Sequence, residues 1–264
     1  MVSTNAVSGV LMVGTLAAFL AASTTLRDTP FSGTASTQHQ QPFKPGEWGY
    51  ADADWLRQHY NITMLSEDPP VIQFNNFISQ ERIDAILHFA KPKFARSTSG
   101  IEREVSNYRT SSTAWMLPDV LGNDPMQAHL KDMEEEIARI VRLPVENQEH
   151  FQVLQYQKNQ YYKVHSDYIE EQRQQPCGIR VATFFLYLND VEEGGGTRFP
   201  NLNLTVQPAK GNAVLWYSAY PNTTRMDSRT DHEAMPVAKG MKYGANKWIH
   251  IHDFVTPWAN GKTV

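Results

Sequence analysis

The chain has 264 residues, of which 41% are hydrophobic and 11% aromatic, and its formal net charge is −4. This composition supplies one sizeable core and excludes a disordered or fibrous protein. The sequence has no block of Lys and Arg, which argues against a nucleic-acid-binding protein. Its single cysteine, Cys177, excludes an intramolecular disulfide.

An apolar stretch near the N-terminus, Gly9 to Ala22, predicts entry into the secretory pathway. The stretch is shorter than the roughly 20 apolar residues of a membrane-spanning helix, so it fits the core of a signal peptide better. No Lys or Arg precedes it, and a short signal anchor is therefore the alternative interpretation. Three Asn-x-Ser/Thr sites, at Asn61, Asn203 and Asn222, agree with a glycoprotein of the endoplasmic reticulum or Golgi lumen.

The rest of the chain divides by composition into a polar lead-in and one main domain. Residues 25–48 are rich in Ser, Thr, Gln, Pro and Gly, which predicts a linker because such a segment buries too little apolar surface to fold. We expect a signal segment at 1–24, a linker with a short helical lead-in at 25–68, and the main domain at 69–257.

Two helices and a series of strands are predicted in the main domain. A strand at 71–74 precedes a helix that Ser79 can cap and Pro92 ends. The Asp124-Pro125 pair begins a second helix, which ends at Leu143-Pro144. Short β-branched and aromatic runs then predict strands at 151–156, 161–166, 180–188, 203–207, 213–217, 232–236 and 247–254. This order predicts an α+β, mainly β fold, with a sandwich or barrel and helices packed on one side.

His165 and Asp167 are the first residues that indicate chemistry. On a strand, positions two apart face the same side, so one imidazole and one carboxylate could reach one ion. With a second histidine from elsewhere they would form the 2-His-1-carboxylate set that suits non-haem Fe(II). Alone, the motif is more often a pair of surface residues at a strand end.

A second histidine and a lysine further along the chain make a metal site at this pair more probable than the isolated motif does. His232 follows downstream, and Lys242 stands ten residues beyond it. This order and spacing resembles the catalytic domain of prolyl 4-hydroxylases, both the collagen alpha-subunit type and the shorter plant and algal type. The likeness runs from about Pro69 to His252 and includes the blocks Pro70–Phe74, Tyr108–Ser112, Tyr187–Asn189, Gly195–Pro200 and Pro208–Tyr217.

The resemblance implies a double-stranded β-helix, or jelly-roll, core with supporting N-terminal helices. It implies an enzyme that hydroxylates peptidyl proline with O2 and 2-oxoglutarate, releases succinate and CO2, and uses Fe(II) and ascorbate. It also implies roles for nine residues: His165, Asp167 and His232 would bind the metal, Lys242, Tyr156 and Thr197 the cosubstrate, and Tyr162, Arg180 and Trp248 a proline-rich peptide. Loops 93–107 and 168–179 would close over that peptide.

Several alternatives stay open on the sequence alone. His250 and His252 could form a second metal site, but a polar strand end explains them better, and His39, His59, His88, His129 and His150 are interpreted as surface residues. Lys239 and Lys247 are interpreted as solvated charges, Tyr156 equally well as a core residue and Thr197 as a turn residue. Lysyl or small-molecule hydroxylation and a catalytically silent peptide-binding module are the rival functions.

The sequence departs from the family at a few positions. Glu233, Ala234 and Met235 follow the distal histidine, where the family usually has small residues and then a cysteine. Ser166 stands where an aromatic residue is frequent. These differences concern the shape of the pocket, and the four metal and cosubstrate positions are intact.

Overall fold

The computed structural model describes residues 40–98 and 107–263. The predicted signal segment, and the linker as far as residue 39, lie outside the described residues. None of the described helices is long and apolar enough to span a membrane. The α-helices are α1 (Ala53–His59), α2 (Gln80–Ala90), α3 (Pro118–Leu121), α4 (Met126–Val141) and α5 (Val255–Ala259), and the 3-10 turns are η1 (Lys91–Lys93), η2 (Val145–Asn147), η3 (Glu170–Gln174), η4 (Pro200–Leu202) and η5 (Ser228–Thr230).

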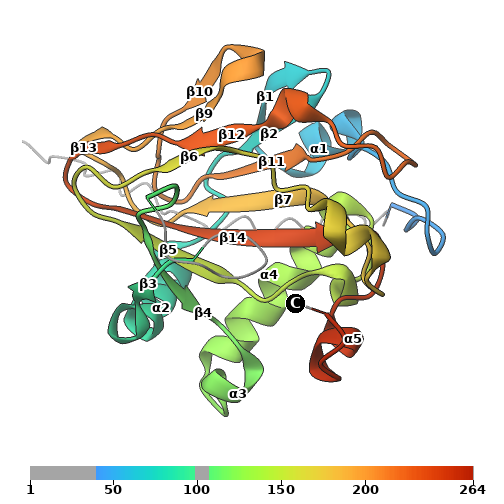
Figure 1. The fold of residues 1–264 in the computed structure, drawn as a ribbon, viewed down its shortest axis with the longest axis horizontal. Coiled ribbons are helices and arrows are strands. Elements are labelled where there is room, and N and C mark those ends of the chain that lie inside the picture. Colours follow the sequence, from blue (N-terminus) through green and yellow to red (C-terminus); the bar gives the residue numbers. More distant parts are fainter. Residues whose placement is uncertain (1–39, 99–106, 264) are drawn as a thin grey trace, which may run out of the picture. The chain divides into compact units, whose positions relative to one another are not determined.

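Two antiparallel sheets form the body of the described fold (Figure 1). The larger sheet has the order β1 (Ile62–Glu67), β2 (Pro70–Phe74), β11 (Ala213–Tyr217), β7 (Arg180–Tyr187), β14 (Lys242–His250), β5 (Gln152–Tyr156), β4 (Ser112–Trp115) and β3 (Ala95–Arg96). The smaller sheet has the order β10 (Leu204–Val206), β9 (Thr197–Phe199), β12 (His232–Ala234) and β6 (Tyr162–His165), and β13 (Val237–Lys239) pairs with β8 (Glu193–Gly194). The predicted mainly β fold with helices packed on one side is confirmed.

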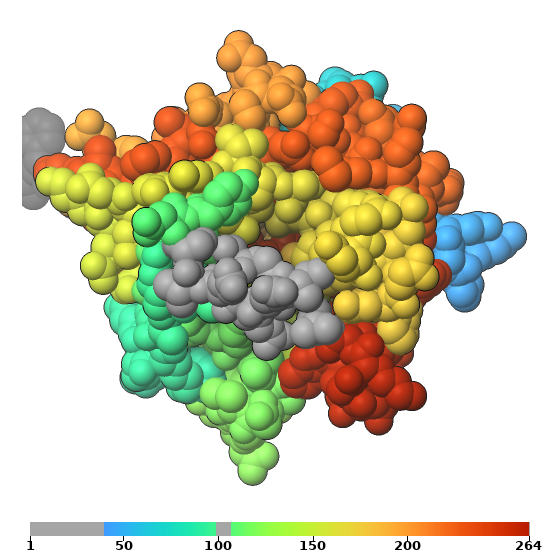
Figure 2. Space-filling model, viewed as in Figure 1, coloured from blue at the N-terminus to red at the C-terminus, as the bar shows by residue number. Residues whose placement is uncertain are grey.

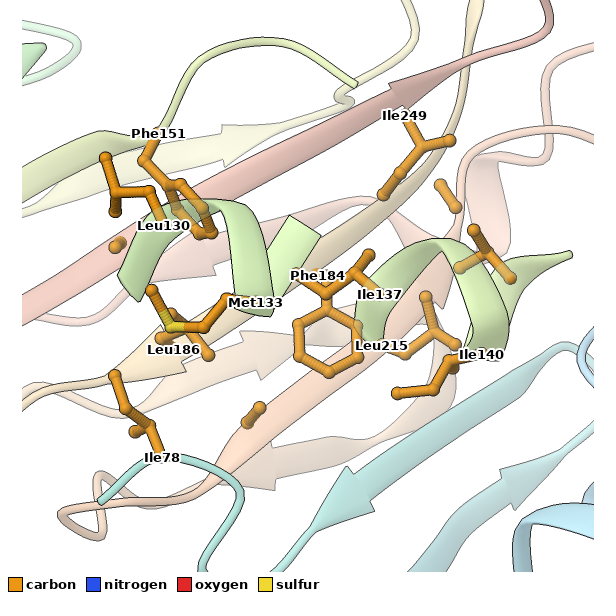
Figure 3. Packing of buried hydrophobic residues seen from close by; sticks show 14 of the residues in the cluster. Ile78, Leu130, Met133, Ile137, Ile140, Phe151, Phe184, Leu186, Leu215 and Ile249 are labelled. Atoms are coloured by element: carbon orange, nitrogen blue, oxygen red, sulfur yellow. The ribbon is translucent and has the colours of Figure 1, made fainter. Parts of the chain in front are cut away.

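Strand β7 explains why the larger sheet has two different faces. Side chains alternate along a strand, so Phe184 and Leu186 point to one side while Phe185 and Tyr187 point to the other. On the first side α4 packs against the sheet, and Figure 3 shows its apolar face, Leu130, Met133, Ile137 and Ile140, directed toward Phe184, Leu186 and Leu215. The second side faces the smaller sheet, and this interior contains the candidate site.

The structure differs from the sequence prediction in the lead-in. Residues 62–67, expected to be linker, form β1 and pair with β2 at the edge of the larger sheet. Trp48 and Leu56 are fully buried in the main core, so the packed unit begins before residue 69. Strand β1 was missed because Thr63, Ser66 and Glu67 make it polar, as an edge strand with one exposed face permits.

The C-terminal half shows smaller differences. The last long strand begins at Lys242, five residues before its predicted start at Lys247, and ends at His250. Strand β4 and helix α3 were not predicted, because each has only four residues and too short a pattern to recognise. Helix α5 ends at Ala259, two residues beyond the predicted boundary at 257.

Candidate active site

Three potential metal ligands meet at the mouth of the interior between the sheets. His165 ends β6 and His232 begins β12, and the two residues are direct partners in the antiparallel ladder. Asp167 Oδ1 lies 3.9 Å from His165 Nε2, and Asp167 Oδ2 lies 3.6 Å from His232 Nε2. One ligand atom from each residue can be chosen so that all three lie within 4.8 Å of one another. The arrangement is compact enough to surround a single ion.

The expected strand spacing of His165 and Asp167 was wrong in one respect. Strand β6 ends at His165, and Asp167 lies in the following loop, where Ser166 Oγ accepts a hydrogen bond from the Tyr168 backbone N–H (3.1 Å). This local turn directs the carboxylate into the site. The cross-strand pairing of His165 with His232 brings the two imidazoles together.

Neighbouring groups fix the orientation of all three side chains. His165 Nδ1 lies 2.8 Å from the Lys163 carbonyl oxygen and His232 Nδ1 lies 3.1 Å from the Thr230 carbonyl oxygen. A carbonyl accepts only from a protonated nitrogen, so in the neutral form of each ring the lone pair is on Nε2. Thr183 Oγ1 donates to Asp167 Oδ2 (2.6 Å). Hydrogen bonds from neighbouring groups to the ligand side chains are typical of metal sites, in which they orient the ligands.

The charge states also suit a divalent metal. Burial and the neighbouring His232 lower the pKa of His165 to about 3, so its ring is neutral. Burial acts to raise the pKa of Asp167, but the neighbouring His232 and the Thr183 hydrogen bond outweigh it, and the carboxyl stays ionised. Neutral imidazoles and a carboxylate are the forms that bind metals. Two nitrogens and one oxygen on one side are the donor set of non-haem Fe(II) oxygenases, so the residues fit that ion.

Lys242 lies deeper in the same interior and lacks an anionic partner among the described residues. The side chain is 1% exposed, and Nζ makes no hydrogen bond to any residue that the structure describes. It lies 5.6 Å from the ring centroid of Tyr156, 5.4 Å from that of Phe185 and 5.5 Å from that of Tyr187. Burial lowers the pKa of Lys242 to about 7. A buried ammonium without a counter-ion is costly, so this position favours an anionic ligand.

Polar groups surround Lys242 at the closed end of the cavity. Tyr156 is its partner across the β5–β14 ladder, and Thr197 is 5% exposed at the start of β9, where its hydroxyl accepts from Tyr187 OH (2.9 Å). The cavity is lined by Leu154, Tyr156, Tyr162, His165, Asp167, Phe185, Thr197, Trp216, His232, Ala234, Lys242 and Asn246. One cavity therefore contains the three potential metal ligands and a cationic anchor.

The cavity opens onto a groove of about 940 Å³. Tyr162, His165 and Asp167 line both spaces, so the candidate metal position lies at their junction. Figure 2 shows the hollow beside the yellow segment that follows β6. Tyr162 stacks on His165 with 3.6 Å between ring centroids, and Arg180 Cζ lies 3.8 Å from the ring centroid of Trp248. The three residues expected to contact a peptide all line this groove.

Comparison with known proteins agrees with this geometry. Residues 151–250 match the sequence model of the 2OG-Fe(II) oxygenase superfamily. Prolyl 4-hydroxylase 5 of Arabidopsis thaliana is 32% identical over 217 residues, which cover 73% of this chain and 72% of that protein. The chain belongs to the prolyl 4-hydroxylase family. It is thus a 2-oxoglutarate-dependent Fe(II) oxygenase, as the resemblance in its sequence predicted.

Other prolyl 4-hydroxylase relatives extend the comparison. Prolyl 4-hydroxylase subunit alpha-2 of Gallus gallus is 34% identical over 201 residues, which cover 72% of this chain but only 36% of that longer protein. A crystal structure of the viral collagen prolyl hydroxylase of Paramecium Bursaria Chlorella virus-1, in complex with 2OG, aligns with a TM-score of 0.54 at 27% identity and covers 68% of this chain and 95% of that one. These relatives confirm the predicted jelly-roll fold.

Two residues of this prolyl 4-hydroxylase family member were interpreted wrongly from sequence. Lys247, expected to be a solvated charge, is 1% exposed, and its Nζ donates to Glu134 Oε1 (2.5 Å). His250, expected at a polar strand end, is fully buried, and its Nε2 lies 2.8 Å from Glu149 Oε1. Neither joins the metal cluster. In each case a distant acidic residue supplies the counter-charge that makes burial tolerable.

The remaining histidines and Lys239 differ in how far they are exposed to solvent. His252 and His88 are exposed, and Lys239 forms an exposed ion pair with Glu192 (2.6 Å). His59, His129 and His150 are partly buried, so the surface interpretation holds only in part for them. His39 lies outside the described residues.

Sequence reasoning missed several residues of the site. Thr183 holds Asp167, Trp216 packs against His232 with ring centroids 4.7 Å apart, and Asn246 lines the cavity. Glu149 accepts from Arg180 Nε (2.5 Å) and fixes that guanidinium at the groove. Thr183 lies two residues before Phe185 on a predicted strand, so the alternation of inward side chains was the available signal for it. Asn246 precedes the predicted start of the last strand at Lys247 and had no such signal.

Proposed function

We propose that the protein hydroxylates peptidyl proline at the ring's 4-carbon, using O2 and 2-oxoglutarate and releasing succinate and CO2. This proposal rests on one observation, in a chain that belongs to the prolyl 4-hydroxylase family. His165, Asp167, His232 and Lys242, which has no partner among the described residues, converge on one cavity at the floor of a groove.

His165, Asp167 and His232 would hold the metal through the two Nε2 atoms and the carboxylate. Bound Fe(II) supplies the redox chemistry that activates O2 against a C–H bond. The hydrogen bonds to the carbonyls of Lys163 and Thr230 keep both Nε2 lone pairs directed at the metal position. Apolar walls from Leu154, Phe185 and Trp216 keep the inner cavity poor in water.

Lys242 would anchor the far carboxylate of 2-oxoglutarate. Its ammonium has no counter-ion in the described residues, so an entering carboxylate supplies the missing partner. Tyr156 and Thr197 line the same end of the cavity, and their hydroxyls can donate to that carboxylate. A cationic anchor at a fixed depth sets the length of dicarboxylate that reaches the metal.

Tyr162, Arg180 and Trp248 would hold the proline-containing backbone at the mouth of the cavity. Glu149 binds the Nε of Arg180, which leaves its terminal N–H groups for peptide carbonyls. Polyproline II segments are already extended, expose their carbonyls and lose little entropy on docking. The segment after Asp167 is better packed than a free lid, since Tyr168, Gln172 and Cys177 in it are buried, so we limit the proposed closure to its exposed residues.

We further infer that the enzyme works in the secretory pathway with ascorbate as a reductant. The apolar stretch at residues 9–22 supports this compartment, and Asn61, Asn203 and Asn222 are all exposed, as glycosylation requires. Secreted proteins with proline-rich segments are the substrate class, and nucleic acid is not expected as a partner. The protein isolated from secreting cells should lose mass when a glycosidase removes N-linked glycans, and peptide mass spectrometry should locate the loss at these three sites.

The function can be tested by following CO2 release from 2-oxoglutarate with Fe(II), ascorbate and panels of peptides. Proline-rich peptides should stimulate turnover, whereas lysine-rich peptides should not. Arg180→Ala should weaken the peptide-dependent reaction more than the slow peptide-free one, because Arg180 lines the groove and not the inner cavity. Stimulation by lysine peptides alone, or an equal loss in both reactions, would contradict the assignment.

A further inference from the structure

Arg109 is a buried cation without a counter-ion in the part of the chain that the structure describes. It is 6% exposed and lies in the wall of the groove. Each of its three side-chain nitrogens donates to a neutral oxygen: Nε to Ser111 Oγ (3.2 Å), Nη1 to the Thr98 carbonyl (3.3 Å) and Nη2 to Gln152 Oε1 (2.9 Å). A charge buried among neutral groups is costly, which indicates that this one serves a further group.

Two contacts connect Arg109 with the candidate metal position. Its Cζ lies 5.0 Å from the ring centroid of Tyr162, and that ring stacks on His165 with 3.6 Å between centroids. Gln152 Oε1, which accepts from Arg109, also accepts from Asn246 Nδ2 (3.1 Å). Tyr162 and Asn246 both line the inner cavity. Arg109 therefore lies directly behind residues that form the wall of this cavity.

The charge of Arg109 reaches the metal ligands through space. Burial and the neighbouring His232 lower the pKa of His165, and the Arg109 guanidinium acts in the same direction. A guanidinium keeps its proton throughout the physiological pH range, so this charge is permanent. Arg180, which also lines the groove, differs because Glu149 neutralises it at 2.5 Å. Arg109 therefore contributes an uncompensated positive charge close to the metal position.

A positive charge near the metal matters because the site collects carboxylates. Asp167 brings one negative charge, and bound 2-oxoglutarate would add two, of which Lys242 can balance one. The remaining negative charge favours Fe(III) over Fe(II), since the ion of higher charge gains more from nearby anions. This effect is larger in an interior of low dielectric than in water. A fixed cation behind Tyr162 and Gln152 opposes it.

We propose that Arg109 is a positioning residue of the metal site, and that its charge keeps bound iron in the Fe(II) state. This inference rests on the metal ligands of the proposed function and is independent of its proline acceptor. The couple exchanges one electron: Fe(II) loses it to O2, and a reductant such as ascorbate returns it to Fe(III). Arg109 shifts this balance toward Fe(II), so the enzyme needs less external reductant.

Gln152→Glu tests the charge without removing Arg109. Glutamate has the same shape, can accept both hydrogen bonds and supplies the carboxylate that Arg109 lacks. A unit charge roughly 10 Å from the iron, at an effective dielectric of about 20, changes a one-electron equilibrium about tenfold, or about 59 mV. The full-length protein is loaded with iron and 2-oxoglutarate without O2 and titrated potentiometrically, while electron paramagnetic resonance measures Fe(III). The midpoint potential of Gln152→Glu should be lower than that of wild type by this amount.

Three further variants separate charge from structure. Gln155→Glu is the matched control, because Gln155 lies on the same strand, β5, but on its opposite face, and the midpoint should stay unchanged. Arg109→Gln should lower the midpoint as Gln152→Glu does, whereas Arg109→Lys keeps the charge and should stay near wild type.

Two results would overturn the proposal: an unchanged midpoint in Gln152→Glu, or equal falls in Arg109→Lys and Arg109→Gln. Because no peptide is present, either result leaves proline hydroxylation as proposed. A wild-type protein that holds no iron would overturn the metal ligands and this inference together.

Discussion

Replacing Lys242 by Met should weaken 2-oxoglutarate binding and at the same time stabilise the free protein. The ammonium is buried, has no partner among the described residues, and has a pKa lowered by burial from 10.5 to about 7. That fall corresponds to a cost on the order of a few kcal/mol for keeping the lysine in the fold near neutral pH. Methionine fills similar space without charge, so Lys242→Met should unfold at a higher temperature than wild type.

Binding of 2-oxoglutarate should be weakened in the same Lys242→Met variant. A charge-assisted contact to a carboxylate is worth roughly 1.5 to 3 kcal/mol, which is about ten- to a hundredfold in affinity. Calorimetric titration of the metal-loaded protein without O2 should therefore give a Kd for 2-oxoglutarate raised by that factor in Lys242→Met. The metal content should be retained, because Lys242 is outside the metal cluster.

The same lysine sets the pH dependence of cosubstrate binding. The free enzyme carries a protonated Lys242 below pH 7 and a neutral one above it. A bound carboxylate favours the charged form, so binding above pH 7 must take up a proton and affinity should fall as the pH rises. The same pKa difference affects folding stability. The lysine of the unfolded chain keeps its proton up to about pH 10.5, so the destabilisation of the fold by Lys242 decreases as the pH rises from 7 to 10.5. An unchanged Kd and pH profile in Lys242→Met would refute this role.

Three further predictions concern the surroundings of the site. Thr183→Val removes the hydroxyl that holds Asp167 and should lower iron affinity about ten- to a hundredfold in a metal titration, while an unchanged affinity would show that this contact is unimportant. Glu134→Ala leaves the buried Lys247 without its ion-pair partner and should lower the free energy of unfolding in urea by up to about 3 kcal/mol. The Glu134→Leu/Lys247→Met double variant should recover most of this stability, and an equal loss in both variants would show that the two charges do not depend on each other. His250→Ala should keep stoichiometric iron while losing stability, and loss of iron would mean that the metal ligands are misassigned.

The residues predicted to bind the metal and the cosubstrate lie in short, ordered motifs of the sequence. His165, Asp167, His232 and Lys242 could be found by spacing alone once the family was suspected, and the structure brings them to one cavity. The local backbone was less predictable. Asp167 reaches the site from a loop instead of a strand, which the two-residue spacing could not reveal.

Burial of charge was the main failure of prediction from sequence. Lys247 and Glu134 are 113 positions apart in the chain, and His250 and Glu149 are 101 apart. A local pattern cannot show such a partner, so each charged residue was expected in solvent. Strand β1 was missed for a related reason, since its place at the sheet edge depends on pairing with β2 and not on its own hydrophobicity.

The central claim is that this site oxidises peptidyl proline, and the most direct test is to identify the product. The purified full-length protein is incubated with Fe(II), 2-oxoglutarate, ascorbate and a proline-rich peptide, and the hydrolysed peptide is analysed for hydroxyproline isomers together with succinate. We expect 4-hydroxyproline in equal amount to the peptide-dependent succinate, and none with His232→Ala. Peptide-free succinate formation without any hydroxyproline across a panel of proline-rich peptides, accompanied by oxidation of lysine or a small molecule, would contradict the account.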